Sequence, residues 1–395
     1  MPTQVLTHKV LLPELSLKLI HWRKGNAQLH LFTEKHCDFE VCPRCAKPSS
    51  SVYDHRQICV KDSPLRNKQI ALHIRKRRFW CKHCRKPFTE PIKGIKKGSR
   101  CTERYKKSLL WACEKFADLK QVRKTYRCST GYLYKTLYEQ LERNRRTRLY
   151  PWPKTIGIDE HFFKRNKKLG TREFASIVVD HKNKRVLELV QGKSVAELEA
   201  ALAYIPGRQN VRFVTLDLCD PFKKFAKSFF QNATLVADKF HVLRLLNPAI
   251  NRYRKEITGD KRSLKIRRLL LTSGKKLHPI ERFVVRKWLQ QYPQLQELYQ
   301  FKEALHGFYR IRGQKKASKA LTDLTDRMAK SDIIEVQRLR RTLMKWRNEI
   351  LAYFSTRLTN GRVEGFNNKA KLVKKRAYGY RSFKNYRLRL LNACA

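Results

Sequence analysis

The order of predicted strands and helices between residues 154 and 246 constrains the fold of this chain more than any other feature. Short apolar runs, each bounded by turn-forming or charged residues, read as strands, and the segments between the later ones have helical periodicity. We therefore predict a mixed α/β domain over residues 151–246. The strands are expected at 155–160, 172–180, 185–190, 211–217 and 233–237, and the helices at 194–205 and 221–230.

Acidic residues close three of these strands, although the chain has 33 Asp and Glu against 89 Lys and Arg. The order strand, strand, strand, helix, strand, helix, strand is that of an RNase H-like fold, whose first and fourth strands are neighbours. Asp159 and Asp217 are then expected to meet at two strand ends. Either aspartate alone is better explained as a solvated strand end. Two adjacent carboxylates favour a cation, and magnesium suits them because it binds a few carboxylates together with phosphate oxygens.

Other acids near these strands have simpler interpretations. Asp220 precedes Pro221 and is expected to cap a helix, and Asp238 is expected to cap the helix at 239–246 or to assist the site with His241. Glu160 is expected on the strand face opposite Asp159.

Glu364 is the strongest candidate for a third metal ligand. It is the only acid between Ile350 and Ala395, where a lone glutamate would otherwise be a salt-bridge partner. The helical segment 247–358 is then an insertion between the last strand and the C-terminal core region 359–395. Basic residues that follow Glu364 are candidate DNA contacts: Lys369, Lys371, Lys374, Lys375 and Arg376.

Two C-x-x-C pairs mark the first domain, predicted at residues 1–92. Cys42, Cys45, Cys81 and Cys84 supply the four thiolates of one structural zinc site, and strand-like runs at 52–60 and 69–79 fill the gap between the pairs. The alternatives are four buried structural cysteines, or substitution of one ligand by Cys37, Cys59 or His83. The basic run Arg75, Lys76, Arg77 and Arg78 is either a phosphate contact or a solvated face.

A helical segment at 93–150 follows the cysteine-rich domain. Predicted helices at 119–126 and 130–142, with Ser129 as N-cap, fit a helix-turn-helix whose second helix enters the major groove. Tyr132, Tyr134 and Lys135 are then expected near the DNA, with Leu133 and Leu137 packed inward. The alternative is a plain helical spacer. The stretch 143–153 is predicted to be a linker.

The formal net charge of +56 and the pI near 10.4 indicate a polyanionic partner, and nucleic acid fits best. The longest run without Asp, Glu, Lys or Arg has ten residues, at 228–237, so no membrane-spanning segment is predicted. With reduced cysteines, a cytoplasmic location is expected.

Several of these motifs together resemble the DDE-type transposases of bacterial insertion sequences, specifically the ISL3 family. The resemblance runs nearly end to end, and its most specific parts are Asp238-Lys-Phe-His241 and Asn360-Gly-Arg-Val-Glu364. It includes the cysteine pairs, the paired helices and Gly157-Ile-Asp159.

This resemblance implies a transposase that cleaves transposon ends and joins them to target DNA. It implies a catalytic triad of Asp159, Asp217 and Glu364 that binds two Mg²⁺ or Mn²⁺ ions, and a homodimer in the active complex, associated with the prokaryotic nucleoid. The alternatives are a non-enzymatic DNA-binding regulator derived from a transposase and an RNA-processing nuclease of the same fold. The retained acids favour the transposase.

Overall fold

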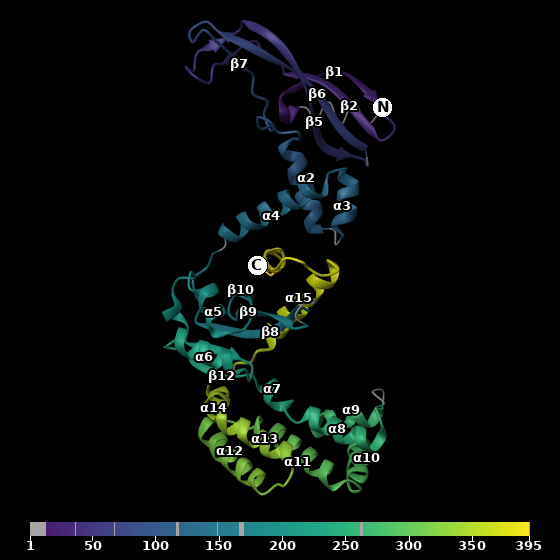
Figure 1. The fold of residues 1–395 in the computed structure, drawn as a ribbon, viewed down its shortest axis with the longest axis vertical. Helices are drawn as coiled ribbons and strands as arrows, with labels where there is room; N and C mark the ends of the chain where they lie inside the picture. The colour runs from purple at the N-terminus through teal and green to yellow at the C-terminus, as the bar shows by residue number, and fades with distance from the viewer. Residues whose placement is uncertain are drawn as a thin grey trace. The chain divides into compact units, whose positions relative to one another are not determined.

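The computed structural model describes residues 13–35, 37–66, 68–115, 118–147, 149–165, 170–260 and 264–394. The chain divides into two compact units. The first comprises Met1–Arg143 with Arg376–Gly379, and the second comprises Asn144–Lys375 with Tyr380–Ala395 (Figure 1). None of the helices in the described ranges is long and apolar enough to cross a membrane.

The first unit is built on a long β-hairpin. Strands β5 and β6 pair antiparallel, and β6 also pairs in parallel with β2, so that Ile70, Leu72 and Ile74 of β6 enter a buried core. The predicted strands at 52–60 and 69–79 are therefore confirmed and are longer than expected. The strands are β1 (Leu17–Lys24), β2 (Gln28–Lys35), β3 (Glu40–Val41), β4 (Pro48–Ser49), β5 (Val52–Leu65), β6 (Lys68–Cys81) and β7 (Lys86–Thr89).

Three helices follow these strands: α2 (Glu103–Lys115), α3 (Leu119–Tyr126) and α4 (Thr130–Thr147). The last residues of α4, from Asn144, belong to the second unit. Ser129 accepts a hydrogen bond from the backbone N–H of Tyr132, as expected of an N-cap. The prediction that a linker begins at residue 143 was wrong, because α4 continues to Thr147. Arginine is a good helix former, and the first proline comes only at Pro151.

The sheet of the second unit has five strands in the order β10-β9-β8-β11-β12. Strands β8, β11 and β12 are parallel, and β9 runs antiparallel to both of its neighbours. The expected pairing of the first and fourth strands is thus present. The strands are β8 (Thr155–Arg165), β9 (Arg172–Asp180), β10 (Arg185–Gln191), β11 (Phe213–Leu216) and β12 (Thr234–Ala237).

Successive side chains of each strand point to opposite faces of this sheet, so the sheet has a separate core on each face. Different helices cover the two faces. Ile156 and Ile158 face one core with α5 (Val195–Leu202) and α6 (Asp220–Phe229). Phe163 and the alternate residues of β9 enter the other core, with α15 (Gly361–Arg376) and α16 (Phe383–Ala393). Odd-numbered positions of β8 therefore face α15.

The segment between β12 and α15 is helical, as predicted, and α14 packs against β12 (Figure 1). The stretch 334–356 of this segment consists of two helices that meet at Trp346. The helices are α7 (Lys239–Leu243), α8 (Asn247–Thr258), α9 (Lys265–Leu271), α10 (Pro279–Leu289), α11 (Pro293–Phe308), α12 (Gln314–Ala329), α13 (Ile334–Lys345) and α14 (Arg347–Thr356). Short 3₁₀ turns lie at Pro13–Leu15, Arg208–Asn210 and Gly274–Lys276.

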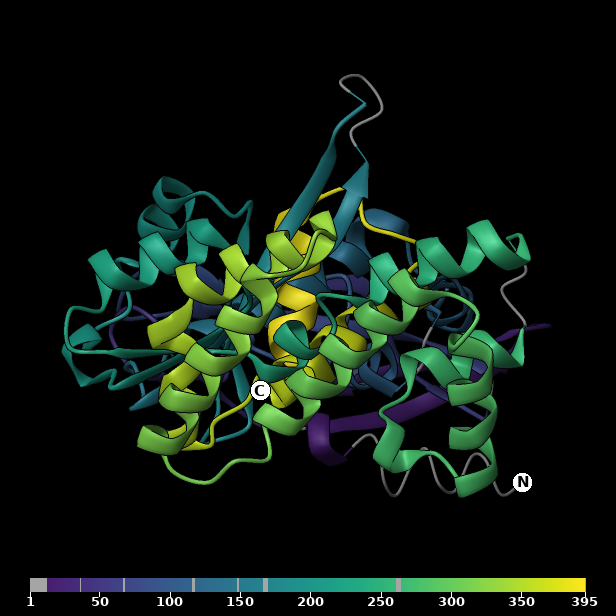
Figure 2. The same cartoon turned by 90° about the horizontal axis from the view of Figure 1, so that it is seen from below.

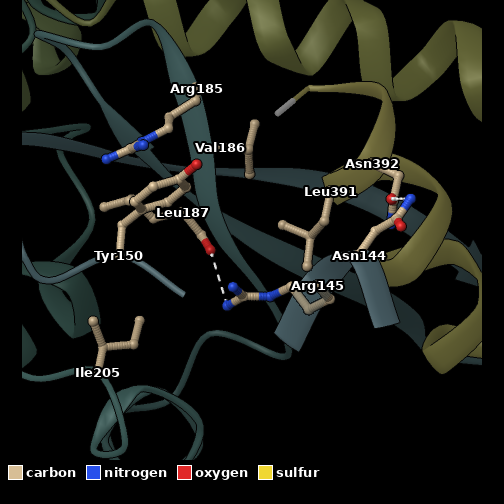
Figure 3. Close-up of a pocket in the computed structure, with 9 residues that line it drawn as sticks. All are labelled: Asn144, Arg145, Tyr150, Arg185, Val186, Leu187, Ile205, Leu391 and Asn392. Atoms are coloured by element: carbon tan, nitrogen blue, oxygen red, sulfur yellow. Dashed lines mark hydrogen bonds between the residues drawn. The ribbon is translucent and has the colours of Figure 1, made fainter. Parts of the chain in front are cut away.

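A small cavity lies where the last turn of α4 meets β10 and α16 (Figure 3). Arg145 donates to the carbonyl oxygen of Leu187 at 3.4 Å, and Asn144 donates to Asn392 at 3.1 Å. The guanidinium of Arg185 lies 3.5 Å from the ring centroid of Tyr150. The cavity volume of about 30 Å³ is about the volume that one water molecule occupies in the liquid. The cavity is therefore a packing gap between these elements and is too small for a ligand.

Candidate active site

Asp159 and Asp217 lie side by side because β8 and β11 pair in parallel. Ile158 is opposite Leu216 in the register, and Asp217 follows the end of β11 directly. The expectation that Asp159 also ends a strand was wrong: β8 continues to Arg165 in a hairpin with β9 that extends beyond the rest of the sheet (Figure 2). Asp159 is instead the first residue of β8 past the segment paired with β11.

Glu364 reaches the same place from α15. A cleft with a volume of about 620 Å³ is lined by all three acids, together with Asp238, His241, Asn360, Asn367 and Lys371. Glu364 is exposed in this cleft, whereas Asp217 keeps only 14% of its side chain accessible. The three acids selected from the sequence are therefore brought together by tertiary structure.

The two aspartates interact strongly. Burial, together with a hydrogen bond to Asp217 and the charge of that residue, raises the pKa of Asp159 to about 8. Burial would also raise the pKa of Asp217, but the hydrogen bonds with His241, Asp159 and Asn360 and the charge of His241 together outweigh burial and lower this pKa. Asp159 therefore tends to hold a proton that Asp217 accepts, which is the usual behaviour of two carboxylates that share one site.

His241 bridges two acids. Its Nδ1 lies 3.0 Å from Oδ1 of Asp217 and 3.1 Å from Oδ2 of Asp238. These two hydrogen bonds raise the pKa of His241 to about 10, so the imidazole is positively charged at neutral pH. The prediction that Asp238 caps the following helix was wrong: its side chain makes no cap bond, and its Oδ1 accepts from the backbone N–H of Asn360.

The sequence analysis assigned no role to Asn360, which is buried beside Asp217. Its Nδ2 donates to Oδ1 of Asp217 at 3.2 Å and to the carbonyl oxygen of Ile158 at 3.1 Å. Its Oδ1 accepts from the hydroxyl of Thr215 at 2.8 Å, which sets the orientation of the amide. Asn360 therefore holds the Asp217 carboxylate in place without adding a charge.

Asn367 has the same relation to Asp159. Its Nδ2 donates to Oδ2 of Asp159 at 2.7 Å, and its Oδ1 lies 3.0 Å from Nδ1 of His161. Burial lowers the pKa of His161 to about 4, so the ring is neutral; Nδ1 donates to Asn367, and Nε2 accepts from Tyr386 at 2.7 Å. A signal for both asparagines was present in the sequence: residues 360, 364 and 367 are spaced to share one helix face.

Two further acids are held in ion pairs, and one of them, Glu160, also lines the cleft. Glu160 forms an ion pair with Lys193 at 3.1 Å. Asp220 is the first residue of α6, with Cys219 as the N-cap, so its predicted capping role was wrong. Its carboxylate lies 2.5 Å from Nζ of Lys345, which is a structural role.

Cys42, Cys45, Cys81 and Cys84 place their sulfur atoms within 4.8 Å of one another. This donor set fits one tetrahedral zinc ion, whose Zn–S bonds of about 2.3 Å separate the sulfurs by about 3.8 Å. Backbone N–H groups of Arg44 and Cys45 lower the pKa of Cys42 to about 7, which favours the thiolate.

The alternative zinc ligands lie outside this cluster. Cys59 and His83 are exposed. Sγ of Cys37 accepts a hydrogen bond of 2.8 Å from the guanidinium of Arg77, so this sulfur is paired with a cation and not with the other cysteines. The four cysteines selected from the sequence are therefore the ones that converge.

The basic residues 75–78 of β6 do not form one exposed surface, because they differ in burial. Arg75 is exposed, whereas Lys76, Arg77 and Arg78 are half-buried. Nη2 of Arg77 lies 3.0 Å from the carboxylate of fully buried Glu90, so Arg77 is a structural residue. Arg75 is the one of these four that is best placed for a phosphate.

On α4, Lys135 is exposed as expected, but Tyr132 is half-buried. The hydroxyl of Tyr132 lies 2.9 Å from Sγ of Cys101, and its ring packs near Tyr105. Tyr132 therefore packs inside the first unit and does not reach the groove as expected. Tyr134, in contrast, is exposed.

The basic residues of α15 also differ. Lys371 lines the cleft, and Lys369, Lys375 and Arg376 are exposed. Lys374 is half-buried and donates to the carbonyl oxygens of Phe162 and Phe163, at 2.7 and 3.1 Å. Lys374 therefore fastens α15 to the free edge of β8.

The proteins to which this chain is similar are transposases. Residues 156–390 match the model of the ISL3 group of DDE enzymes, described as "Transposase", and this span includes all three acids. Residues 38–84 match the zinc finger of transposases IS204/IS1001/IS1096/IS1165 and contain the four cysteines. The chain is 24% identical over 366 residues to the transposase for insertion sequence element IS1001 of Bordetella parapertussis, covering 89% of this chain and 87% of that protein.

Proposed function

Because the chain belongs to the ISL3 family of DDE transposases, we propose that it cleaves the DNA ends of an insertion sequence and joins them to target DNA. The observation that carries the proposal is the convergence of Asp159, Asp217 and Glu364 on one cleft. The strand order, with the first and fourth strands adjacent, supports an RNase H-like catalytic core.

The donor set suits divalent cations. Three carboxylates from separate segments open into one cleft, and the neighbouring charge of Asp217 raises the pKa of Asp159, a repulsion that a bound cation would relieve. Asp159, Asp217 and Glu364 would hold two such ions. Two Mg²⁺ or Mn²⁺ ions bound there would activate a water or a 3′-hydroxyl and stabilise the leaving oxygen.

The protein's own residues orient this site and attract DNA. Asn360 and Asn367 fix the two aspartates, while Lys371 and Arg244 supply positive charge to the cleft for a phosphate backbone. Charged His241 supports Asp217 and Asp238. These groups bind and position, and none has to carry the reacting proton.

Additional DNA contacts belong to the first unit. Helices α3 and α4, joined by three residues, are proposed as a helix-turn-helix with Lys135 near the major groove. The zinc ribbon is proposed to position exposed Arg75 for contact with a DNA phosphate.

The active complex is proposed to contain two copies of the chain, because two transposon ends must be joined. It is proposed to act on the nucleoid in the cytoplasm.

The test is a cleavage assay on purified full-length chain with a labelled duplex that carries the end of its insertion sequence. We expect cleavage at the end in Mg²⁺ or Mn²⁺, joining to a target plasmid, and neither reaction in EDTA. Specific binding without cleavage in either metal would instead indicate a DNA-binding regulator. Cleavage of RNA–DNA hybrids without preference for the end would indicate a nuclease.

A further inference from the structure

Two aromatic rings are exposed inside the cleft that holds the three acids. Phe162 on β8 keeps 43% of its surface accessible and Phe240 on α7 keeps 38%, and both residues line this cleft. Single exposed apolar residues are ordinary on protein surfaces. Two phenyl rings from different elements in one acidic cleft are a feature that metal binding does not explain.

A lysine ammonium lies over the ring of Phe162. Nζ of Lys374 is 4.9 Å from the ring centroid and is held there by the carbonyl oxygens of Phe162 and Phe163. The ring of Phe174 contacts Phe162 edge-on, with 6.4 Å between centroids. The Phe162 ring is therefore supported by two neighbours while much of its surface stays open.

Phe240 on α7 is likewise an exposed ring with a lysine ammonium over it. Nζ of Lys239 lies 5.2 Å from the ring centroid of Phe240, and the hydroxyl of Tyr353 accepts from the same ammonium at 3.2 Å. His241, the next residue, contacts Asp217. This ring is therefore adjacent in the chain to a residue of the carboxylate cluster.

We propose that Phe162 and Phe240 form a stacking subsite for unpaired nucleobases next to the cleaved phosphate. This inference rests on the proposed function and names how the same cleft holds its DNA. A nucleotide combines a flat π surface with an anion, and each of these sites combines a phenyl ring with an ammonium. Lys371 and Arg244 add positive charge along the same lining.

The chemistry of the cleft disfavours an apolar protein segment as the occupant. Such a segment would cover the carboxylates and ammonium groups without pairing them, which is unfavourable. The base must be unpaired, because bases inside a duplex stack on one another and expose only their edges. The predicted ligand is therefore a DNA end whose bases beside the cut leave the helix.

Binding measurements on two duplexes test the proposal. One duplex carries the natural end of the insertion sequence, and the other replaces the two bases beside the cut by abasic sites. In EDTA, Phe162→Ala and Phe240→Ala are each expected to bind the natural duplex roughly 5- to 150-fold more weakly than the parent, the range for loss of one stacked base. Neither substitution should weaken binding to the abasic duplex.

Two further variants separate stacking from other effects. Phe162→Tyr should bind as the parent does, whereas Phe162→Leu, which keeps apolar bulk without a ring, should bind as weakly as Phe162→Ala. Phe283→Ala is the matched control, because Phe283 on α10 is 64% exposed and does not line the cleft. A base analogue such as 2-aminopurine beside the cut should become more fluorescent with the parent than with Phe162→Ala.

Different results would overturn different claims. If the parent cleaves the DNA end but both alanine variants bind the two duplexes as the parent does, stacking is wrong and the proposed function stands. Parent-like DNA binding by Phe162→Leu would mean that apolar bulk and not ring stacking holds the DNA, whereas loss of self-association in the alanine variants would assign the rings to a protein interface. If the parent shows no preference for the DNA end and no cleavage, the proposed function itself fails.

Discussion

The side-chain amide of Asn367 donates a 2.7 Å hydrogen bond to Oδ2 of Asp159, which joins the helix that carries Glu364 to the strand that carries the first aspartate. Asn360 makes the equivalent bond to Asp217, seven residues earlier along the chain. Formation of the three-acid site is therefore coupled to docking of α15 on the sheet. Neutral amides suit this task, because a lysine or arginine would neutralise the carboxylates.

Replacing Asn367 by alanine should weaken both the fold and the site. The substitution leaves Nδ1 of buried His161 without its acceptor and removes the donor to Oδ2 of Asp159, so the free energy of unfolding should fall by about 1–3 kcal/mol. Mn²⁺ affinity and the cleavage rate should fall by about 10- to 100-fold. Urea unfolding, Mn²⁺ titration and cleavage kinetics measure these effects. Asn368→Ala is the control, since Asn368 is exposed; equal behaviour of the two variants would contradict a positioning role for Asn367.

Glu364→Gln should separate DNA binding from catalysis. The change keeps the size of the side chain but removes a negative charge, so DNA binding should be retained or become tighter. Cleavage and strand joining should fall by several orders of magnitude. Adding Asp159→Asn should make the defect little worse, because residues that act as a unit are not additive.

Asp220→Asn is the matched carboxylate control for Glu364→Gln. Asp220 pairs with Lys345 on an exposed surface and does not line the cleft, so its loss should have a small effect on cleavage. Near-parental cleavage by Glu364→Gln, or inactivity of Asp220→Asn beside an active Asp217→Asn, would mean that the triad is assigned incorrectly.

The purified chain should contain one zinc ion, held by the four clustered cysteines. Cys42→Ser should lower the zinc content and unfold the surrounding part of the first unit, because the binding energy of a structural zinc contributes to folding. Metal analysis and hydrogen exchange measure the two effects. Cys59→Ser should keep the zinc, since Cys59 is exposed and outside the cluster. Full zinc occupancy after replacement of both Cys42 and Cys81 would refute the assignment.

Gly157→Ala should displace α15 from β8. A Cβ atom at Gly157 would lie 2.4 Å from Cγ2 of Val363 and 2.7 Å from Oδ1 of Asn360, well inside contact distance. Overpacking of this kind should lower the free energy of unfolding by about 1–3 kcal/mol and reduce cleavage through Asn360. Gly131→Ala in α4 meets no atom within 4 Å and should stabilise the chain by up to about 1 kcal/mol. Unchanged unfolding of Gly157→Ala would show that α15 packs less closely than described.

Glu188→Gln should destabilise the second unit in a pH-dependent way. Glu188 is buried, and its carboxylate pairs with Arg145 and Arg387. Burial opposes ionisation, but Arg387, the Tyr204 hydroxyl and the charge of Arg145 together outweigh burial and lower the pKa of Glu188 below its usual 4.5. The ionised group therefore stabilises the fold above pH 4.5, and this contribution is lost as the pH falls through the folded-state pKa.

The substitution should accordingly cost about 3–5 kcal/mol at pH 7, with the difference from the parent shrinking below about pH 4.5. Denaturant unfolding across pH 3–7 measures it. Glu256→Gln removes an exposed carboxylate and should change stability by less than about 1 kcal/mol. A pH-independent difference for Glu188→Gln would mean that lost packing, and not the charge, is responsible.

Local patterns in the sequence predicted much of this architecture. Apolar runs placed the strands of the second unit, and the spacing of the two C-x-x-C pairs selected the four cysteines that cluster. The end of α4 was misplaced because a basic run beside prolines resembles a linker. Tyr132 was assigned to the DNA-facing side because helical periodicity does not tell which neighbour, here Cys101, lies opposite a half-buried ring.

The sequence by itself determined the elements and the three acids, because strand and helix periodicity and the isolation of Glu364 are properties of neighbouring residues. Only the tertiary structure decided that Asn360 and Asn367 hold two of those acids, that Asp238 binds a backbone N–H instead of capping its helix, and that Phe162 and Phe240 enter the cleft. The physical reason is that each of these contacts joins residues far apart in the chain. Their geometry is set when α15 docks on the sheet across the helical insertion, and no local pattern encodes that distance.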